Sequence, residues 1–366
     1  MTSKAFELAR LGNAYSDGAL SNRNLIINGN FSVWQRASAT TTVSANNYFT
    51  ADRWKFFKDS GANYYTSERS TDVPSGQGFG YSMKLQCVVA DTSIGSSQYA
   101  QIVQRIEGQD CQRLAYGSSG AKDLTVSFWV KSNKTGTYTI CLRKDDGTPY
   151  NLPVEYSISS ANTWEKKEIL LSPTAGNTSL ITNSGGAIAN DTGVGLDLYF
   201  NLMLGSSYSG GTNNTWTSNS GNDYATSNQL NWLDSTSNNF YITGIQLEVG
   251  DTATPFEHRS FGDELARCQR YYCILDFQTA HLALLIRAGE DSSGKPYNYF
   301  TLPVEMRAAS SLTTSGTFLD GAQYTDTPSL YKATTGAVTL VGNNGNISAG
   351  SSQFLRGGQV LLDAEL

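Results

Sequence analysis

Hydrophobic and polar positions alternate in short runs over most of the chain. In the clearest run, 124–130 (LTVSFWV), Leu124, Val126, Phe128 and Val130 share one face. Successive side chains of a strand point to opposite faces, so this period predicts strands with one buried face. Further strands are predicted at 81–89, 102–106, 138–142 and 196–204. Many short strands with only short helical candidates between them predict an all-β, antiparallel β-sandwich.

Two segments, 24–36 (NLIINGNFSVWQR) and 241–259 (YITGIQLEVGDTATPFEHR), bracket these strands. The first predicts an entry strand with a turn at Asn28-Gly29-Asn30 inside it. The second predicts a closing strand that ends at Pro255, with a bulge at Gly244, where the alternation shifts by one residue. Both can belong to one sheet only if the fold brings start and end together, as jelly rolls do. We therefore expect residues 23–260 to form a jelly-roll β-sandwich.

The flanking segments follow other patterns. Residues 1–22 carry apolar side chains near helical spacing but are too short for a stable lone helix. They are interpreted either as a frayed N-terminal segment or as an attachment and self-association segment. The period changes at 261–272 (FGDELARCQRYY), which predicts a short linking helix. Residues 273–366 predict a smaller C-terminal β domain, with strands at 282–287, 299–306, 312–318, 337–341 and 359–362.

Charge limits the partners. Only 16% of the 366 residues are charged, the net charge is −6, and no Lys or Arg occurs between Glu168 and His258. Phosphate backbones and anionic membrane surfaces are bound by clustered basic residues, so nucleic acid is not an expected partner. No stretch reaches the roughly 18 apolar residues of a membrane span, and residues 1–20 lack a signal-peptide run. Membrane insertion is therefore not expected either.

The sequence offers little for catalysis or metal binding. Its two histidines, His258 and His281, accompany no nucleophile elbow and complete no zinc spacing. Segment 289–295 (GEDSSGK) matches the start of a phosphate-binding loop, but Pro296 replaces the required Ser or Thr, so a hairpin turn is predicted. The five widely spread cysteines predict reduced thiols. We expect no cofactor, no metal and no enzyme activity, although carboxylate pairs for glycoside hydrolysis remain open among 32 acidic residues.

A long polar segment, 205–239, contains the candidate binding residues. Its Ser/Asn/Gly-rich background holds four large aromatic residues, which are Tyr208, Trp216, Tyr224 and Trp232. Sugars stack their C–H faces on exposed rings and pair their hydroxyls with amide and carboxylate side chains. The four rings either contact a glycan or pin the segment onto the sandwich. The remaining tryptophans, Trp34, Trp54, Trp129 and Trp164, lie in or beside predicted strands and are expected in the core.

Several motifs, taken in order, resemble a module of bacteriophage and prophage tail-fibre proteins. The motifs are 24–36, 51–54 (ADRW), 102–108 (IVQRIEG), 124–131 (LTVSFWVK) and 242–256 (ITGIQLEVGDTATPF). The start of such proteins is similar to 1–11 (MTSKAFELARL), and their usual continuation to 261–272, 302–307 (LPVEMR) and 363–366 (DAEL). The resemblance implies a jelly roll related to carbohydrate-binding modules, mounted on a virion, often homotrimeric, with a host-surface glycan as ligand. Many such jelly rolls hold a structural calcium ion, but no calcium-loop spacing occurs in this sequence.

This resemblance leads to an expected role. The protein would be made in the host cytoplasm and assembled into the virion through residues 1–22, which would contact other virion proteins. Because the chain lacks a repeat shaft or heptad stem, we expect a short tail fibre or a fibre tip that binds glycan by avidity. One alternative is a capsid or tail decoration or adaptor protein without a glycan ligand. A second is a virion-associated polysaccharide depolymerase.

Overall fold

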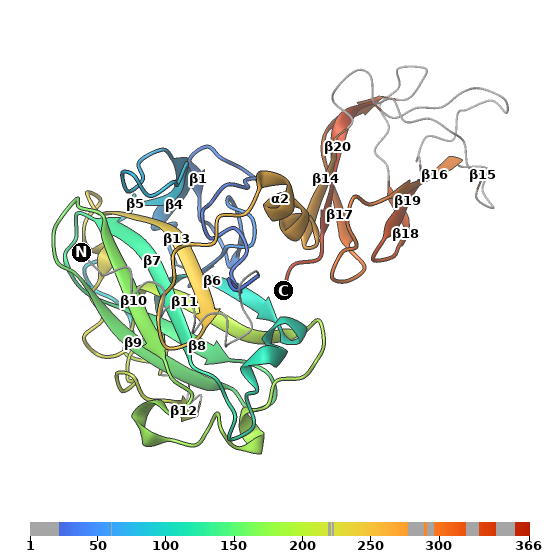
Figure 1. Ribbon diagram of the computed structural model, residues 1–366. Coiled ribbons are helices and arrows are strands. Elements are labelled where there is room, and N and C mark those ends of the chain that lie inside the picture. Colours follow the sequence, from blue (N-terminus) through green and yellow to red (C-terminus); the bar gives the residue numbers. More distant parts are fainter. Residues whose placement is uncertain are drawn as a thin grey trace. The chain divides into compact units, whose positions relative to one another are not determined.

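The computed structural model describes residues 22–59, 61–218, 221, 223–276, 289–290, 296–319, 329–341 and 356–366. The chain divides into two compact units, Met1–Phe261 and Gly262–Leu366, called here the sandwich unit and the C-terminal unit (Figure 1). The proposed attachment segment lies outside the described residues, Asn22 excepted, as do the expected strand 282–287 and His281.

The sandwich unit consists of two antiparallel sheets, which confirms the predicted all-β jelly-roll class. The six-stranded sheet has the order β1-β4-β5-β13-β7-β10, and the seven-stranded sheet the order β12-β9-β8-β11-β6-β3-β2. The six strands are β1 (Thr41–Thr42), β4 (Tyr65–Ser70), β5 (Ser82–Cys87), β13 (Asn239–Val249), β7 (Leu124–Ser132) and β10 (Glu165–Leu171). The seven are β12 (Thr217–Ser218), β9 (Tyr150–Ile158), β8 (Gly136–Lys144), β11 (Val194–Leu204), β6 (Tyr99–Glu107), β3 (Lys55–Lys58) and β2 (Asn47–Tyr48). Short 3-10 helices connect them, namely η1 (Gly108–Leu114), η2 (Ala175–Asn177), η3 (Ser184–Gly186) and η4 (Trp232–Asp234).

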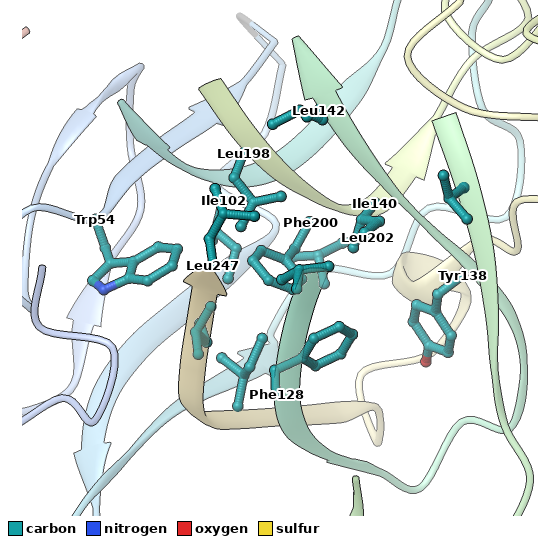
Figure 2. Close-up of a cluster of buried hydrophobic side chains, with 14 of the residues drawn as sticks. Trp54, Ile102, Phe128, Tyr138, Ile140, Leu142, Leu198, Phe200, Leu202 and Leu247 are labelled. Atoms are coloured by element: carbon teal, nitrogen blue, oxygen red, sulfur yellow. The ribbon is translucent and has the colours of Figure 1, made fainter. Parts of the chain in front are cut away.

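One hydrophobic core fills the space between the two sheets (Figure 2). From the seven-stranded sheet, β11 contributes the predicted inward face, with Leu198 and Phe200 fully buried. Phe200 contacts Phe128 of the six-stranded sheet with ring centroids 5.1 Å apart, and Trp54 at 6.2 Å. The alternation of 124–130 and 196–204 therefore predicted the core-facing side chains correctly, because both strands are covered on one face by the opposite sheet.

The two bracketing segments lie side by side, as predicted. The amide of Leu25 donates to the carbonyl of Leu247 (2.8 Å), and the amide of Ile245 donates to the carbonyl of Gly29 (3.0 Å). A side chain at position 29 would overlap the Ile245 carbonyl oxygen, so only glycine allows this approach. The Asn28 side chain holds the turn by donating to the Val33 carbonyl (2.8 Å) and accepting from the Val33 amide (3.0 Å).

Two expectations about these segments were wrong. Residues 24–36 form no ladder strand, because Asn28 and Phe31 adopt positive φ angles of 58° and 53°, which interrupt extended backbone. The closing strand β13 ends at Val249 and not at Pro255. Its end is set by Thr254, whose amide turns back to donate to the Glu248 carboxylate (2.8 Å). The predicted bulge is present, with the register to β7 shifting between Thr243 and Gln246.

The C-terminal unit begins with the predicted short helix, α2 (Phe261–Gln269), and then returns to strands. One sheet has the order β14-β20-β17, with β14 (Tyr272–Asp276), β20 (Arg356–Asp363) and β17 (Ser311–Leu319). The other has the order β15-β16-β19-β18, with β15 (Gly289–Glu290), β16 (Pro296–Thr301), β19 (Ala337–Val341) and β18 (Ser329–Ala333). The strand expected at 299–306 ends at Thr301, and Met306 instead packs in the small core of this unit.

Candidate functional site

The structure separates the four candidate residues into two pairs. Trp216 and Trp232 are 1% and 0% exposed, so neither ring is available to a ligand. Both indole N–H groups donate to backbone carbonyls, that of Trp216 to Ser172 (2.8 Å) and that of Trp232 to Asn239 (3.1 Å). The interpretation of these two residues as glycan contacts is therefore corrected. They pin segment 205–239 onto the sandwich, because each ring is buried in the core and its polar atom is satisfied there.

Tyr208 and Tyr224, by contrast, remain half-buried on the outer face of the seven-stranded sheet. This face is turned away from the core, since Leu198 and Phe200 of β11 point inward and Tyr199 and Asn201 point outward. The segment is tied onto it by the Asn201 side chain, which donates to the Tyr224 carbonyl (2.8 Å), and by Asn151, which donates to Asp223 (2.7 Å). Polar side chains that project from β11 and β9 thus place Tyr224 over the sheet.

Five aromatic rings form a continuous row on this face. The aromatic row consists of Tyr99, Tyr208, Tyr224, Tyr199 and Phe57. Ring centroids are 5.5 Å apart for Tyr99 and Tyr208, 6.3 Å for Tyr208 and Tyr224, 5.4 Å for Tyr224 and Tyr199, and 6.0 Å for Tyr199 and Phe57. Tyr199 is 5% exposed, whereas the other four rings are half-buried. Those four present ring surface at the outside of the sandwich.

A row of alternating charge runs beside these rings. Arg105 on β6 and Arg143 on β8 both stand directly opposite Asp197 on β11 in the strand register. Nε of Arg105 lies 3.5 Å from Oδ1 of Asp197, and Tyr199 donates its hydroxyl to Oδ2 of Asp197 (3.2 Å). Arg143 donates from Nε to Asp145 (2.6 Å) and from Nη1 to the Tyr224 hydroxyl (2.6 Å). The charged row therefore orients two rings of the aromatic row.

Burial controls the protonation of this face. Desolvation raises the pKa of Asp197 to about 6, although Arg105 opposes the shift by favouring the carboxylate. Burial likewise raises the pKa of Tyr224 to about 12, against the attraction of Arg143 for the phenolate. The Tyr199 pKa also lies well above its ordinary value because the ring is buried. These phenols remain neutral hydrogen-bonding groups at physiological pH.

Sequence reasoning identified only part of this site. It named Tyr208 and Tyr224 but not Tyr99, Tyr199 or Phe57. The available signal was the set of outward positions on β6, β8 and β11, where Arg105, Arg143 and Asp197 alternate with mainly apolar inward residues. The structure also places Trp129 and Trp164 on the outer side of the six-stranded sheet, half-buried and not in the core as expected. Trp54 is in the core, as predicted.

Among the described residues, the cysteine, histidine and acidic side chains form no metal-binding cluster and no disulfide. No group of three or more His, Cys, Asp or Glu that could hold a metal ion occurs among the residues that the structure describes. All five cysteines are buried free thiols, as the sequence predicted. No helix within the described ranges is long and apolar enough to cross a membrane.

The comparisons with known proteins concern structure alone, because no family model and no curated protein sequence matches the chain. The enzymatically active domain of tailspike protein 4 from bacteriophage CBA120 is 14% identical, with a TM-score of 0.31 over 62% of this chain and 21% of that chain. The family 11 carbohydrate-binding module from Clostridium thermocellum, in complex with a β-1,3-1,4-mixed-linked tetrasaccharide, is 14% identical, with a TM-score of 0.28 over 60% and 99%. TmCBM61 in complex with β-1,4-galactotriose is 13% identical, with a TM-score of 0.28 over 63% and 100%. Such distant likenesses assign the chain to no family.

Proposed function

We propose that this chain is a bacteriophage virion protein that binds a host-surface glycan on the outer face of its seven-stranded sheet. The observation that carries the proposal is the aromatic row, whose neighbouring rings lie 5.4–6.3 Å apart and four of which are half-buried on this face. Ring faces stack against the C–H faces of sugars, and the phenol hydroxyls can pair with sugar hydroxyls. A row of aromatic rings along a sheet suits a chain of several sugars better than it suits a monosaccharide.

The charges of this face favour a neutral or weakly charged glycan. Arg105 is paired with Asp197 and Arg143 with Asp145, so the positive charges are compensated by neighbouring carboxylates. A face of this kind differs from the unpaired basic clusters that bind phosphate backbones. It supports recognition by stacking and hydrogen bonds, with the charges acting mainly to hold the rings in place.

We further propose that the protein binds its glycan without cleaving it. Glycoside hydrolysis requires two carboxyl groups that reach the glycosidic bond. Asp197 has a raised pKa, as a general acid would, but its side chain is only 1% exposed. Tyr199 and Arg105 contact both of its oxygens, so a glycosidic oxygen has no route to it. Asp197 is better explained as the group that fixes Arg105 and Tyr199.

The virion assignment rests on the ordered motifs that resemble tail-fibre proteins. In that setting the chain would act as a short tail fibre or fibre tip, docked through residues 1–22 and assembled as a homotrimer. Single sugar contacts are weak, and several copies on one particle would raise the apparent affinity by avidity. A lone protomer should accordingly bind weakly.

An array of bacterial surface polysaccharides tests the glycan proposal. The variant Tyr208→Ala/Tyr224→Ala removes two half-buried rings, and binding to the recognised polysaccharide should fall by roughly tenfold per ring, equivalent to about 1.4 kcal/mol each. Tyr241→Ala is the matched control, because Tyr241 is a half-buried tyrosine on β13 of the six-stranded sheet. Loss in the control but not in the double variant would contradict the proposed face. Release of reducing sugar from the bound polysaccharide would contradict binding without cleavage.

A further inference from the structure

A pocket of about 330 Å³ opens on the outer side of the six-stranded sheet, away from the aromatic row. Its floor includes Ser127 and Trp129 of β7, and its wall includes Phe79, Phe256 and His258 from two loops. Ring centroids in the wall are 5.1 Å apart for Phe79 and Phe256, 5.3 Å for Phe79 and His258, and 4.9 Å for Phe256 and His258. The volume falls within the roughly 300–1,000 Å³ typical of small-ligand sites.

The bulge at Gly244 shapes this pocket. Gly244 has a φ of 62°, and a Cβ there would lie 2.5 Å from Cζ of Phe79. Glycine therefore both permits the bulge and leaves room for the Phe79 ring beside the strand. Because Phe79 is 9% exposed and contacts both Phe256 and His258, the wall is formed without a ligand.

Trp129 differs from every other tryptophan of the chain in its hydrogen bonding. Five of the six indole N–H groups have protein acceptors, which are Phe31 O for Trp34, Asn28 O for Trp54, Asp72 Oδ1 for Trp164, Ser172 O for Trp216 and Asn239 O for Trp232. The Trp129 N–H has no acceptor among the described residues, although the ring lies half-buried in the pocket lining. The pocket therefore presents both a half-buried ring and an indole donor that a ligand can reach.

The polar groups around Trp129 indicate an uncharged ligand with hydroxyl groups. Among the described residues no Asp or Glu lines the pocket, and the lysine that does, Lys166, is paired with Glu168 (2.7 Å). Ser127, Gln77 and His258 supply groups that can donate or accept hydrogen bonds. A sugar ring fits both features of the pocket. Its apolar C–H face can stack on the indole, and the hydroxyl groups at its rim can pair with the polar side chains.

We propose that this pocket is a second glycan site, which takes one neutral pyranose ring stacked on the Trp129 indole. The site extends the proposed function to the opposite sheet and does not depend on the aromatic row. It would bind an end group or side branch of a glycan, because the aromatic wall closes one side of the pocket. The Trp129 N–H donates to a sugar oxygen in the bound state.

Indole N–H signals in a nitrogen–proton correlation spectrum of the isotope-labelled full chain test this site. The probes are the methyl pyranosides of glucose, galactose, mannose and N-acetylglucosamine, added one at a time up to about 20 mM, well above a millimolar dissociation constant. One probe should shift the Trp129 signal saturably and leave the buried Trp54, Trp216 and Trp232 signals in place. Trp129→Phe assigns the signal by removing it. This variant should also bind the same probe about tenfold more weakly, equal to about 1.4 kcal/mol.

Trp164→Ala is the matched control, since Trp164 is half-buried on the same side of the sandwich but its N–H already donates to Asp72 (3.0 Å). This variant should bind the probe as the unmodified chain does. A Trp129 signal that no probe shifts would overturn the second site, as would equal binding by Trp129→Phe and the unmodified chain. The Tyr208→Ala/Tyr224→Ala variant separates the two proposals, because it should lose polysaccharide binding and keep the Trp129 shift.

Discussion

Replacing Asp197 with asparagine is expected to change the pH dependence of the stability of the sandwich unit. Burial raises the pKa of Asp197 from 3.8 to about 6 in the folded chain. The folded state therefore binds more protons than the unfolded state between these two values. Stability from this group is present at low pH and is lost as the pH rises through that window. Above pH 6 or so, the folded chain contains a buried carboxylate that an asparagine would replace with a neutral group.

The two pKa values give the size of the effect. Ionisation of Asp197 disfavours the folded state by roughly 3 kcal/mol at about pH 7.5, and by about half as much at about pH 5. Asp197→Asn should therefore gain on the order of 1 kcal/mol more at the higher pH than at the lower one. The attraction between Arg105 and the Asp197 carboxylate is already contained in the folded-state pKa, which it lowers. The difference between the two pH values is thus the informative quantity.

Urea unfolding followed by tryptophan fluorescence measures this difference, because all six tryptophans belong to the sandwich unit. Tyr199→Phe is a useful companion variant, since it removes the hydroxyl that favours the Asp197 carboxylate. Stability of that variant should fall more steeply with pH than stability of the unmodified chain. If Asp197→Asn changes the unfolding free energy equally at both pH values, Asp197 ionises near its ordinary pKa and the burial argument fails.

Two further outcomes follow from buried side chains. Trp232→Ala should lower the unfolding free energy by about 3–5 kcal/mol, seen as a lower urea midpoint, because a fully buried ring and its hydrogen bond are both lost. An effect below about 1 kcal/mol would contradict the anchoring role. The thiols should react with a colorimetric thiol reagent only on unfolding, since burial raises the pKa of Cys87 and of Cys273 to about 11. Fewer than five reactive thiols after unfolding would contradict the free-cysteine assignment.

The sequence predicted the sandwich where strands are covered on one face only. Period-2 alternation located β5, β6, β7, β8 and β11, and it located the bulge of β13. It missed β9 and β10 for identifiable reasons. β9 contains Pro153, which lacks an N–H and is tolerated because β12 pairs only with Asn151 and Tyr150. β10 places charged Lys167 toward the partly covered side of the sheet, so its alternation lacks an apolar set.

Exposure of the tryptophans was harder to predict, because the core residues and the carbonyl acceptors that a buried indole contacts come from distant parts of the sequence. Trp216 lies in a Ser/Asn/Gly-rich segment, yet its N–H reaches the carbonyl of Ser172, and the ring is buried. Trp129 lies in the most regular strand of the chain, yet it faces outward. The alternation of residues 124–130 already implied the outward direction of Trp129. If Leu124, Val126, Phe128 and Val130 point into the core, residue 129 must point away from it. A large ring on the outward face of a strand can be covered by other segments or by a ligand, and the pocket beside Trp129 leaves space for a ligand.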